Sequence, residues 1–192
     1  MNHAAFEKFA KRIEPQAGWK DLALPEEQKE KLREIAARLK QHTGITNEET
    51  AGVKKTRRPG IRAHFAGESG TGKTMACEAL ANELNLPLYR MDVQSVLNKY
   101  IGETEKKLKL FFNAANERNA ILFFDEADAL FGKRTHVKDS HDRYSNIEIN
   151  YLLHSIETYP SLAIIGTANS DADDAFLRKM PVVVQFTSQK QV

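Results

Sequence analysis

Eight consecutive residues, GESGTGKT at 67–74, place three glycines and one lysine directly after an apolar run, IRAHFA, and before a helical pattern, TMACEALANEL. The stretch fits the spacing G-x-x-x-x-G-K-[ST], which a strand–loop–helix setting turns into a phosphate-binding loop. Glycine lets the backbone curl and present its N–H groups to anionic oxygens, and the start of a helix near Lys73 adds a positive end. An ordinary glycine-rich turn is the alternative interpretation.

Two further side chains of this stretch suit phosphate chemistry. Lys73 can reach the outer phosphates of a nucleotide, and the hydroxyl of Thr74 can hold a magnesium ion.

A second candidate site is ILFFDE at 121–126, an apolar strand that ends in two carboxylates. Asp125 would lie at the carboxyl end of its strand, where ligands bind in open parallel sheets, and could orient a magnesium ion and its waters. Glu126 could then polarise a water for attack on a γ-phosphate. We expect this strand to neighbour the one that leads into the glycine loop. The alternative is that the Asp-Glu pair only caps a helix.

Alternating strand and helix patterns must position these residues. From Pro25 to His42 apolar residues recur at helical spacing, and past Pro59 short apolar runs such as AILFF and LAII alternate with amphipathic segments. Strands that are apolar throughout are covered on both faces. The pattern predicts an α/β fold in which a parallel sheet carries helices on both faces, preceded by an N-terminal helical segment. Together with the phosphate-binding spacing at 67–74, it indicates the three-layer sandwich of a P-loop NTPase.

The pattern and the two candidate motifs together suggest three parts of the chain. We expect an N-terminal helical extension at 1–43, a polar and then basic linker at 44–60, and an ATP-binding core at 61–192.

Composition narrows the function classes. The chain has 192 residues, 41% of them hydrophobic, and a formal net charge of +2, which gives no case for broad attraction to nucleic acid or to membranes. No apolar run approaches the length that spans a bilayer, and no secretory signal is visible. The single cysteine, Cys77, fits a reducing compartment. We therefore expect a cytoplasmic protein.

With both motifs in place, the chain resembles AAA-type ATPases of the AAA+ superfamily from about Trp19 to Phe186. WKDL at 19–22 is similar to the family's entry segment, whose backbone lies near the adenine, although a lone tryptophan is more often a core residue. The motifs and this resemblance together imply that the following residues contact the nucleotide: Asp21, Leu22, Gly67, Glu68, Ser69, Gly70, Thr71, Gly72, Lys73, Thr74 and Met75.

The resemblance implies further roles. In KYIGETEKKL, the triplet Tyr100, Ile101 and Gly102 is similar to the loop that faces a central pore and grips a polypeptide, whereas Tyr100 read alone could be a packed surface aromatic. Asn169 in GTAN matches the polar sensor of the γ-phosphate. Arg178 in DDAFLRK resembles the arginine finger that enters a neighbouring subunit's site. The catalytic set implied is thus Glu126, Lys73, Asn169 and Arg178, with Thr74 and Asp125 on the metal.

The chain also departs from the family pattern. Only about four residues, SDAD at 170–173, separate Asn169 from the segment DAFLR at 174–178, which is shorter than is usual in the family. Pro181 stands where a second arginine commonly follows, and the sequence ends at Val192 without a counterpart of the family's helical lid.

The expectation is an ATP- and Mg²⁺-dependent ATPase that remodels or unfolds protein substrates, with a homohexameric ring as a possible assembly. The alternative is a nucleotide-dependent binding module or switch with little turnover. A DNA-associated loader and a small-molecule kinase find less support in the sequence.

Overall fold

The computed structural model of the chain describes residues 10–44, 60–93, 104–131, 140–168, 178 and 180–187. Its strands are β1 (Lys11–Ile13), β2 (Ile61–Ala66), β3 (Leu88–Asp92), β4 (Ile121–Asp125), β5 (Leu162–Thr167) and β6 (Val182–Gln185). Its helices are α2 (Glu26–Gly44), α3 (Lys73–Leu84), α5 (Thr104–Glu117) and α6 (Ser140–Thr158), with short 3₁₀ turns η1 (Trp19–Asp21) and η2 (Ala127–Leu130).

The strands form one sheet in the order β1-β3-β4-β5-β2-β6. All pairings from β3 to β6 are parallel, whereas β1 runs antiparallel to β3 at the edge. The predicted α/β sandwich is confirmed, with one element that the sequence did not indicate: residues 11–13 add an antiparallel strand instead of belonging to a helical extension.

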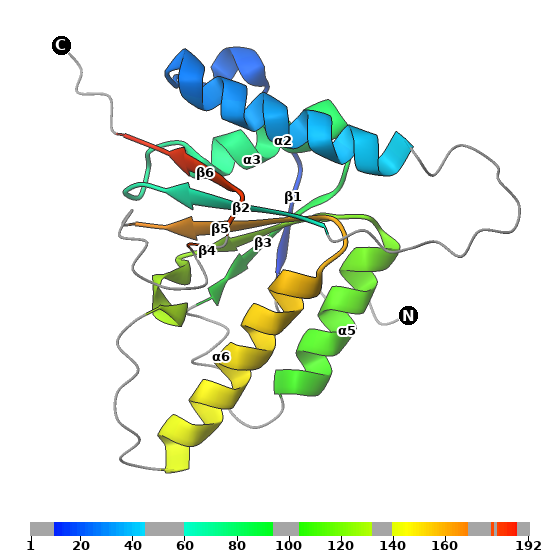
Figure 1. Ribbon diagram of the computed structural model, residues 1–192, viewed down its shortest axis with the longest axis vertical. Coiled ribbons are helices and arrows are strands. Elements are labelled where there is room, and N and C mark those ends of the chain that lie inside the picture. The colour runs from blue at the N-terminus through cyan, green and yellow to red at the C-terminus, as the bar shows by residue number, and fades with distance from the viewer. Residues whose placement is uncertain are drawn as a thin grey trace, which may run out of the picture.

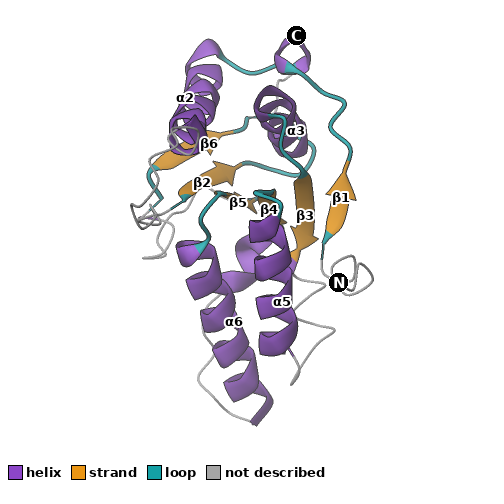
Figure 2. Cartoon of the chain, turned by 90° about the vertical axis from the view of Figure 1, so that its right-hand side faces the viewer, coloured by secondary structure: helices purple, strands orange, loops and turns teal. Residues whose placement is uncertain are grey.

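Helices cover both faces of the sheet. Figure 1 shows α2 and α3 above the strands and α5 and α6 below them, and the rotated view in Figure 2 keeps the same three layers. The central strands β4 and β5 are buried along their whole length, because both of their faces meet helices.

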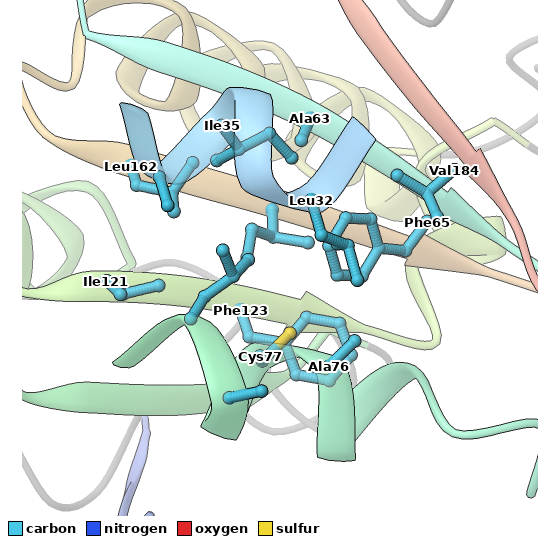
Figure 3. Packing of buried hydrophobic residues seen from close by; sticks show 14 of the residues in the cluster. Leu32, Ile35, Ala63, Phe65, Ala76, Cys77, Ile121, Phe123, Leu162 and Val184 are labelled. Carbon is cyan, nitrogen blue, oxygen red and sulfur yellow. The ribbon is translucent and has the colours of Figure 1, made fainter. Parts of the chain in front are cut away.

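The face under α2 and α3 holds one hydrophobic core. Leu32 and Ile35 of α2 and Cys77 of α3 point toward strand side chains that include Phe65 and Phe123 (Figure 3). Leu32 and Ile35 are fully buried, and each such side chain stabilises the fold by about 1.5–3 kcal/mol. This packing places α2 on the same sheet as the elements that follow residue 60.

A second core lies on the opposite face, between the sheet and α5 and α6. It contains Phe111 and Phe112 of α5, Leu152 and Ile156 of α6, and Phe124 of β4. Each of these two helices therefore buries one apolar face against the sheet.

The parallel strands all present their carboxyl ends at one edge of the sheet. The arrows of β2 and β5 run to the same side in Figure 1. The glycine loop, Asp125 and Thr167 consequently lie along one edge, where ligands bind in open α/β sheets.

No helix in the described parts of the chain is both long and apolar enough to cross a membrane. The proposed linker at 44–60 falls almost entirely outside the described residues, so the division of the chain at 43 and 60 stays a prediction.

Candidate nucleotide site

The glycine loop, residues 67–72, follows β2 and leads directly into α3. Gly67, Gly70 and Gly72 have φ angles of +155°, +82° and +100°. Residues that carry a side chain rarely adopt these backbone angles. A Cβ at Gly67 would also lie 2.2 Å from the carbonyl oxygen of Phe186. At Gly70 and Gly72 an added Cβ would meet nothing within 4 Å in the described parts of the chain. The first glycine is thus needed for close packing, and the other two for a curled backbone beside open space.

Backbone hydrogen bonds fix the base of this loop to the sheet. The N–H of Gly67 donates to the carbonyl of Thr167 at 3.0 Å, and the N–H of Phe186 donates to the carbonyl of Ala66 at 2.7 Å. The loop is therefore held from both sides, by β5 and by the end of β6.

Lys73 bends back over the loop that precedes it. Its side chain is largely buried, with 9% of the residue exposed, and its ammonium donates to the carbonyl oxygens of Gly67 and Glu68, the latter at 2.9 Å. The hydroxyl of Thr71 also donates to the Glu68 carbonyl, at 2.7 Å. Because an ammonium has three donors, Lys73 can brace the loop and still offer a donor to an anion beside it.

The first turn of α3 completes this side of the site. A helix of this length places unpaired N–H groups and a partial positive charge at its first turn. Thr74 is half-buried in that turn, whereas Met75 is 41% exposed and Ser69 in the loop is exposed. The loop, Lys73 and the helix start together form a cradle that favours a multiply charged anion.

Asp125 ends β4 with both carboxylate oxygens engaged. Oδ1 accepts the N–H of Glu126 at 3.0 Å, and Oδ2 lies 2.6 Å from the guanidinium Nη2 of Arg90 on β3. The Asp125 side chain is 12% exposed and that of Arg90 is 43% exposed. Arg90 was not singled out from the sequence; the signal that could have found it is a single arginine between the apolar residues Tyr89 and Met91 of the strand LYRMD.

The charge of Asp125 also reaches under α3. Burial raises the pKa of the Cys77 thiol well above its ordinary value, and the neighbouring charges of Asp125 and Glu78 raise it further. Cys77 is fully buried, so it is a packing residue beneath the site and not a nucleophile.

The strand with the two acids does not neighbour the strand of the glycine loop. β5 lies between β4 and β2, so the expectation that the two strands would be adjacent is wrong. Two strand spacings separate Asp125 from the loop by about 10 Å along the edge. That gap is wide enough for a phosphate group and a hydrated cation between them.

Glu126 has an unusual backbone. Its φ and ψ are 53° and 38°, the left-handed region that a glutamate seldom occupies. The residue is exposed and precedes η2. This geometry turns the chain sharply after Asp125 and presents the Glu126 side chain at the sheet edge instead of continuing the strand. Strain of this kind gathers at functional sites.

Of the predicted sensor, arginine-finger and pore-loop residues, the structure describes Arg178 alone. Arg178 is exposed, and it lies in the segment between β5 and β6. Asn169 and the triplet Tyr100, Ile101 and Gly102 lie outside the described residues, so their roles stay predictions.

The entry segment is placed mainly by packing. The indole N–H of Trp19 donates to Glu83 at 3.3 Å, and the Arg33 guanidinium lies 5.8 Å from the ring centroid. Glu83 is in the last turn of α3, about 16 Å along the helix from the glycine loop. The Asp21 carboxylate accepts the N–H of Gly18 at 2.7 Å. These contacts make Trp19 a packing residue, and the Asp21 side chain caps its own turn.

Leu22 is 3% exposed in the core with α2 and α3. Contact of Asp21 and Leu22 with a nucleotide stays a prediction.

The donor set fits a nucleotide with its metal better than a metal alone. Within the described residues, no group of three histidine, cysteine, aspartate or glutamate side chains could hold a metal ion. Mg²⁺ is commonly held by one or two protein oxygens together with substrate phosphates and water. Thr74 and Asp125, on either side of the open edge, could supply those protein oxygens.

Comparison with known proteins agrees with this geometry. The family model "ATPase family associated with various cellular activities (AAA)" matches residues 63–188. An uncharacterized AAA family ATPase, y4kL of Sinorhizobium fredii, is 29% identical over 93% of this chain and 52% of its own length. Protein SAV of Sulfolobus acidocaldarius is 30% identical over 86% of this chain and 21% of its own length. The chain thus spans about half or less of these relatives.

Among solved structures, the crystal structure of the FIGL-1 AAA domain superposes with a TM-score of 0.70 at 23% identity, covering 97% of this chain and 61% of that one. A likeness at this identity supports the fold. Together with the family match over 63–188, which includes the glycine loop and both acids, it shows that the chain belongs to the AAA family of ATPases.

Proposed function

We propose that this chain binds ATP with Mg²⁺ at the glycine loop and hydrolyses it to ADP and phosphate. The observation that supports the proposal most is the arrangement along one sheet edge. A curled loop with a buried lysine lies on one side of β5, and the Asp125–Glu126 pair lies on the other.

Each group has a role that follows from its chemistry. The backbone N–H groups of the loop and the start of α3 hold the phosphates, and Lys73 neutralises their charge. Glu126 accepts a proton from the attacking water, since an exposed carboxylate at the sheet edge is free to face it. Asn169 orients the γ-phosphate region, and Arg178 neutralises that region in the site of a neighbouring subunit.

The metal would be held between Thr74 and Asp125. A bound magnesium ion would act there as a Lewis acid on the phosphoryl oxygens. Asp125 is oriented for this position by the Glu126 N–H and Arg90, and its remaining lone pairs can bind the waters of the ion.

The experiment that tests this function separates binding from turnover. Glu126→Gln keeps the size of the side chain but removes its basicity, so ATP affinity should stay within about twofold while phosphate release falls by about 10²–10⁴-fold. The matched control is Glu117→Gln, the same change at an exposed glutamate at the end of α5. It should alter neither ATP affinity nor phosphate release. Equal loss of binding and turnover in Glu126→Gln would contradict the role given to this residue. Wild-type binding without turnover would instead favour the nucleotide-dependent switch.

We further propose that the chain acts on protein substrates as part of a ring. This proposal is supported by the resemblance of Tyr100, Ile101 and Gly102 to a pore loop and by the exposure of Arg178, which a residue that reaches another subunit requires. Light scattering with and without ATP should show nucleotide-dependent assembly.

Mixing inactive Arg178→Ala and Lys73→Ala chains should restore part of the phosphate release, because each can complete the other's site. No restoration in an assembled mixture would contradict a shared site.

A further inference from the structure

A buried histidine lies three residues before the glycine loop. His64 on β2 has no exposed surface, and burial lowers the pKa of its imidazole although the charge of Asp128 opposes this shift. Nε2 lies 2.8 Å from the hydroxyl oxygen of Thr167 on β5. Nδ1 has no hydrogen-bond partner among the described residues. An unsatisfied buried polar atom destabilises a fold, so stability alone does not account for a histidine at this position.

Thr167 is a junction between this histidine and the glycine loop. Its side chain meets His64, and its backbone carbonyl accepts the N–H of Gly67 at 3.0 Å. His64 and Thr167 are diagonal neighbours on one face of the sheet, because Thr167 pairs with Ala66 in the register of β2 and β5. This is the face under α6, since Arg62 on the same strand face donates to the Glu157 carbonyl of that helix at 2.7 Å.

Ala168, the residue after Thr167, is hydrogen-bonded to a third element, η2. The N–H of Ala168 donates to both carboxylate oxygens of Asp128 in η2, at 3.2 and 3.0 Å. Asp128 follows the Asp125–Glu126 pair by a few residues, so the end of β5 is attached at once to the glycine loop, to β2 and to the acid-bearing turn.

We propose that His64, Thr167 and Asp128 form a polar tie that positions the turn after β5 relative to the glycine loop and the acid pair. The three are positioning residues: they act through the backbone of residues 167 and 168. The proposal rests on the proposed ATP hydrolysis, because the turn leads into Asn169, the predicted γ-phosphate sensor.

The tie should govern the rate of hydrolysis and leave ATP affinity unchanged. The loop keeps its own glycines, its lysine and the Gly67–Thr167 backbone hydrogen bond whatever the side chains at 64 and 167 are. The side-chain contacts, in contrast, hold residues 167 and 168, which lead into the predicted sensor. A small misplacement of a reacting geometry slows chemistry far more than it weakens binding.

The test uses a double variant, His64→Leu with Thr167→Val. Replacing both hydrogen-bond partners with apolar groups of similar shape is close to neutral for folding. The thermal midpoint should therefore stay within about 2 °C of the wild type or rise, while kcat falls about tenfold and the Kd for ATP changes by less than about twofold. The single variant Thr167→Ser keeps both His64 and a hydroxyl at 167, so its kcat should stay close to that of the wild type.

A matched control removes a buried hydrogen bond at the opposite end of β5. The hydroxyl of Tyr159, just before the strand, donates to the Ala120 carbonyl at 2.7 Å in a buried setting. Tyr159→Phe should lower the thermal midpoint and leave kcat unchanged. A double variant with wild-type kcat would overturn the proposal, and so would one that loses ATP affinity in proportion to its rate.

A second measurement does not depend on turnover. In hydrogen exchange, the amide of Ala168 should exchange faster in the double variant and in Asp128→Ala, while amides in the middle of β4 and β5 stay protected. Unchanged exchange at Ala168 would refute the tie even if the wild type hydrolyses ATP. If the wild type does not hydrolyse ATP, the proposed function fails, and the exchange result alone then decides whether the tie exists.

Discussion

At the scale of single residues, Glu126 combines a proposed catalytic side chain with an unfavourable backbone conformation. Its carboxylate is the proposed base, and its backbone adopts a left-handed conformation with φ of 53°. Two asparagines, Asn85 and Asn119, share that conformation, but asparagine tolerates it much better than glutamate does. A glutamate at this position therefore lowers local stability. The same backbone conformation directs its side chain away from the strand.

This conflict predicts a trade between stability and activity. Glu126→Gly should relieve the left-handed strain and raise the free energy of unfolding by about 1 kcal/mol, while phosphate release is lost with the carboxylate. Denaturant unfolding and a phosphate assay would measure the two effects. Asn85→Gly, at a φ of 51°, is the control and should change stability less. A destabilised Glu126→Gly protein would show that the backbone there is unstrained.

At the scale of elements, the site is assembled across strands that are far apart in the sequence. β5 separates the loop-bearing strand from the acid-bearing strand, and β3 supplies Arg90 to the acid on β4. The proposed phosphate-binding loop and the acid pair therefore follow different strands, and β5 lies between those strands. The ends of these strands, more than any one helix, define the site.

The Arg90–Asp125 pair gives a prediction for this cross-strand contact. Arg90→Met should lower the free energy of unfolding by about 1 kcal/mol, because it leaves a mostly buried carboxylate without its cation. Arg12→Met on β1 removes an ion pair with Glu14 in which both side chains are more than half exposed, and it should cost well under about 0.5 kcal/mol. Chemical denaturation of the two variants makes the comparison. Equal effects would mean that the burial of Asp125 adds nothing to the pair.

Much of the element structure follows from local sequence signals. Apolar spacing around Leu32 and Ile35 predicted a helix from Pro25 to His42, and the structure has one at Glu26–Gly44. The glycine loop was predicted together with its strand and helix, because its φ requirements select glycine at fixed positions. The all-apolar runs around Phe123 and Ile164 are buried central strands, as expected.

The parts that sequence did not reveal depend on distant contacts. β1 is a three-residue strand whose polar residues Lys11 and Arg12 show no apolar alternation; it forms because β3 offers an open edge. The place of β5 between β2 and β4 depends on how helices cross over the sheet. Arg90, His64 and Asp128 gain their significance only once the strand order brings them beside Asp125, Thr167 and Ala168.

At the scale of the whole molecule, one sheet separates two apolar cores, and each core is closed by a pair of helices (Figure 2). The candidate nucleotide site lies where the strands of this sandwich end, and it combines those strand ends with the glycine loop and the start of α3. α2 takes part in the same core as the strands after residue 60, which makes it part of the folding unit described here.

The reactivity of the Cys77 thiol measures whether the core between α2, α3 and the sheet is closed. Cys77 is fully buried and the pKa of its thiol is raised well above its ordinary value, so a thiol reagent should not modify it in the folded protein even at pH 9. Modification in increasing denaturant should follow the same midpoint as the loss of helical circular dichroism, because the core between α2, α3 and the sheet must open first. Fast modification of the native protein would mean that this core opens independently of the rest.

The most direct test of the account is a calorimetric titration of ATP with Mg²⁺ into the wild type and Lys73→Ala. Lys109→Ala, an exposed change on α5 on the opposite face of the sheet, is the control. We predict binding in the wild type and the control, and a loss of at least about tenfold in affinity for Lys73→Ala, because a buried ammonium beside the phosphates has no replacement. Equal affinity in all three proteins would contradict the claim that this loop holds the triphosphate.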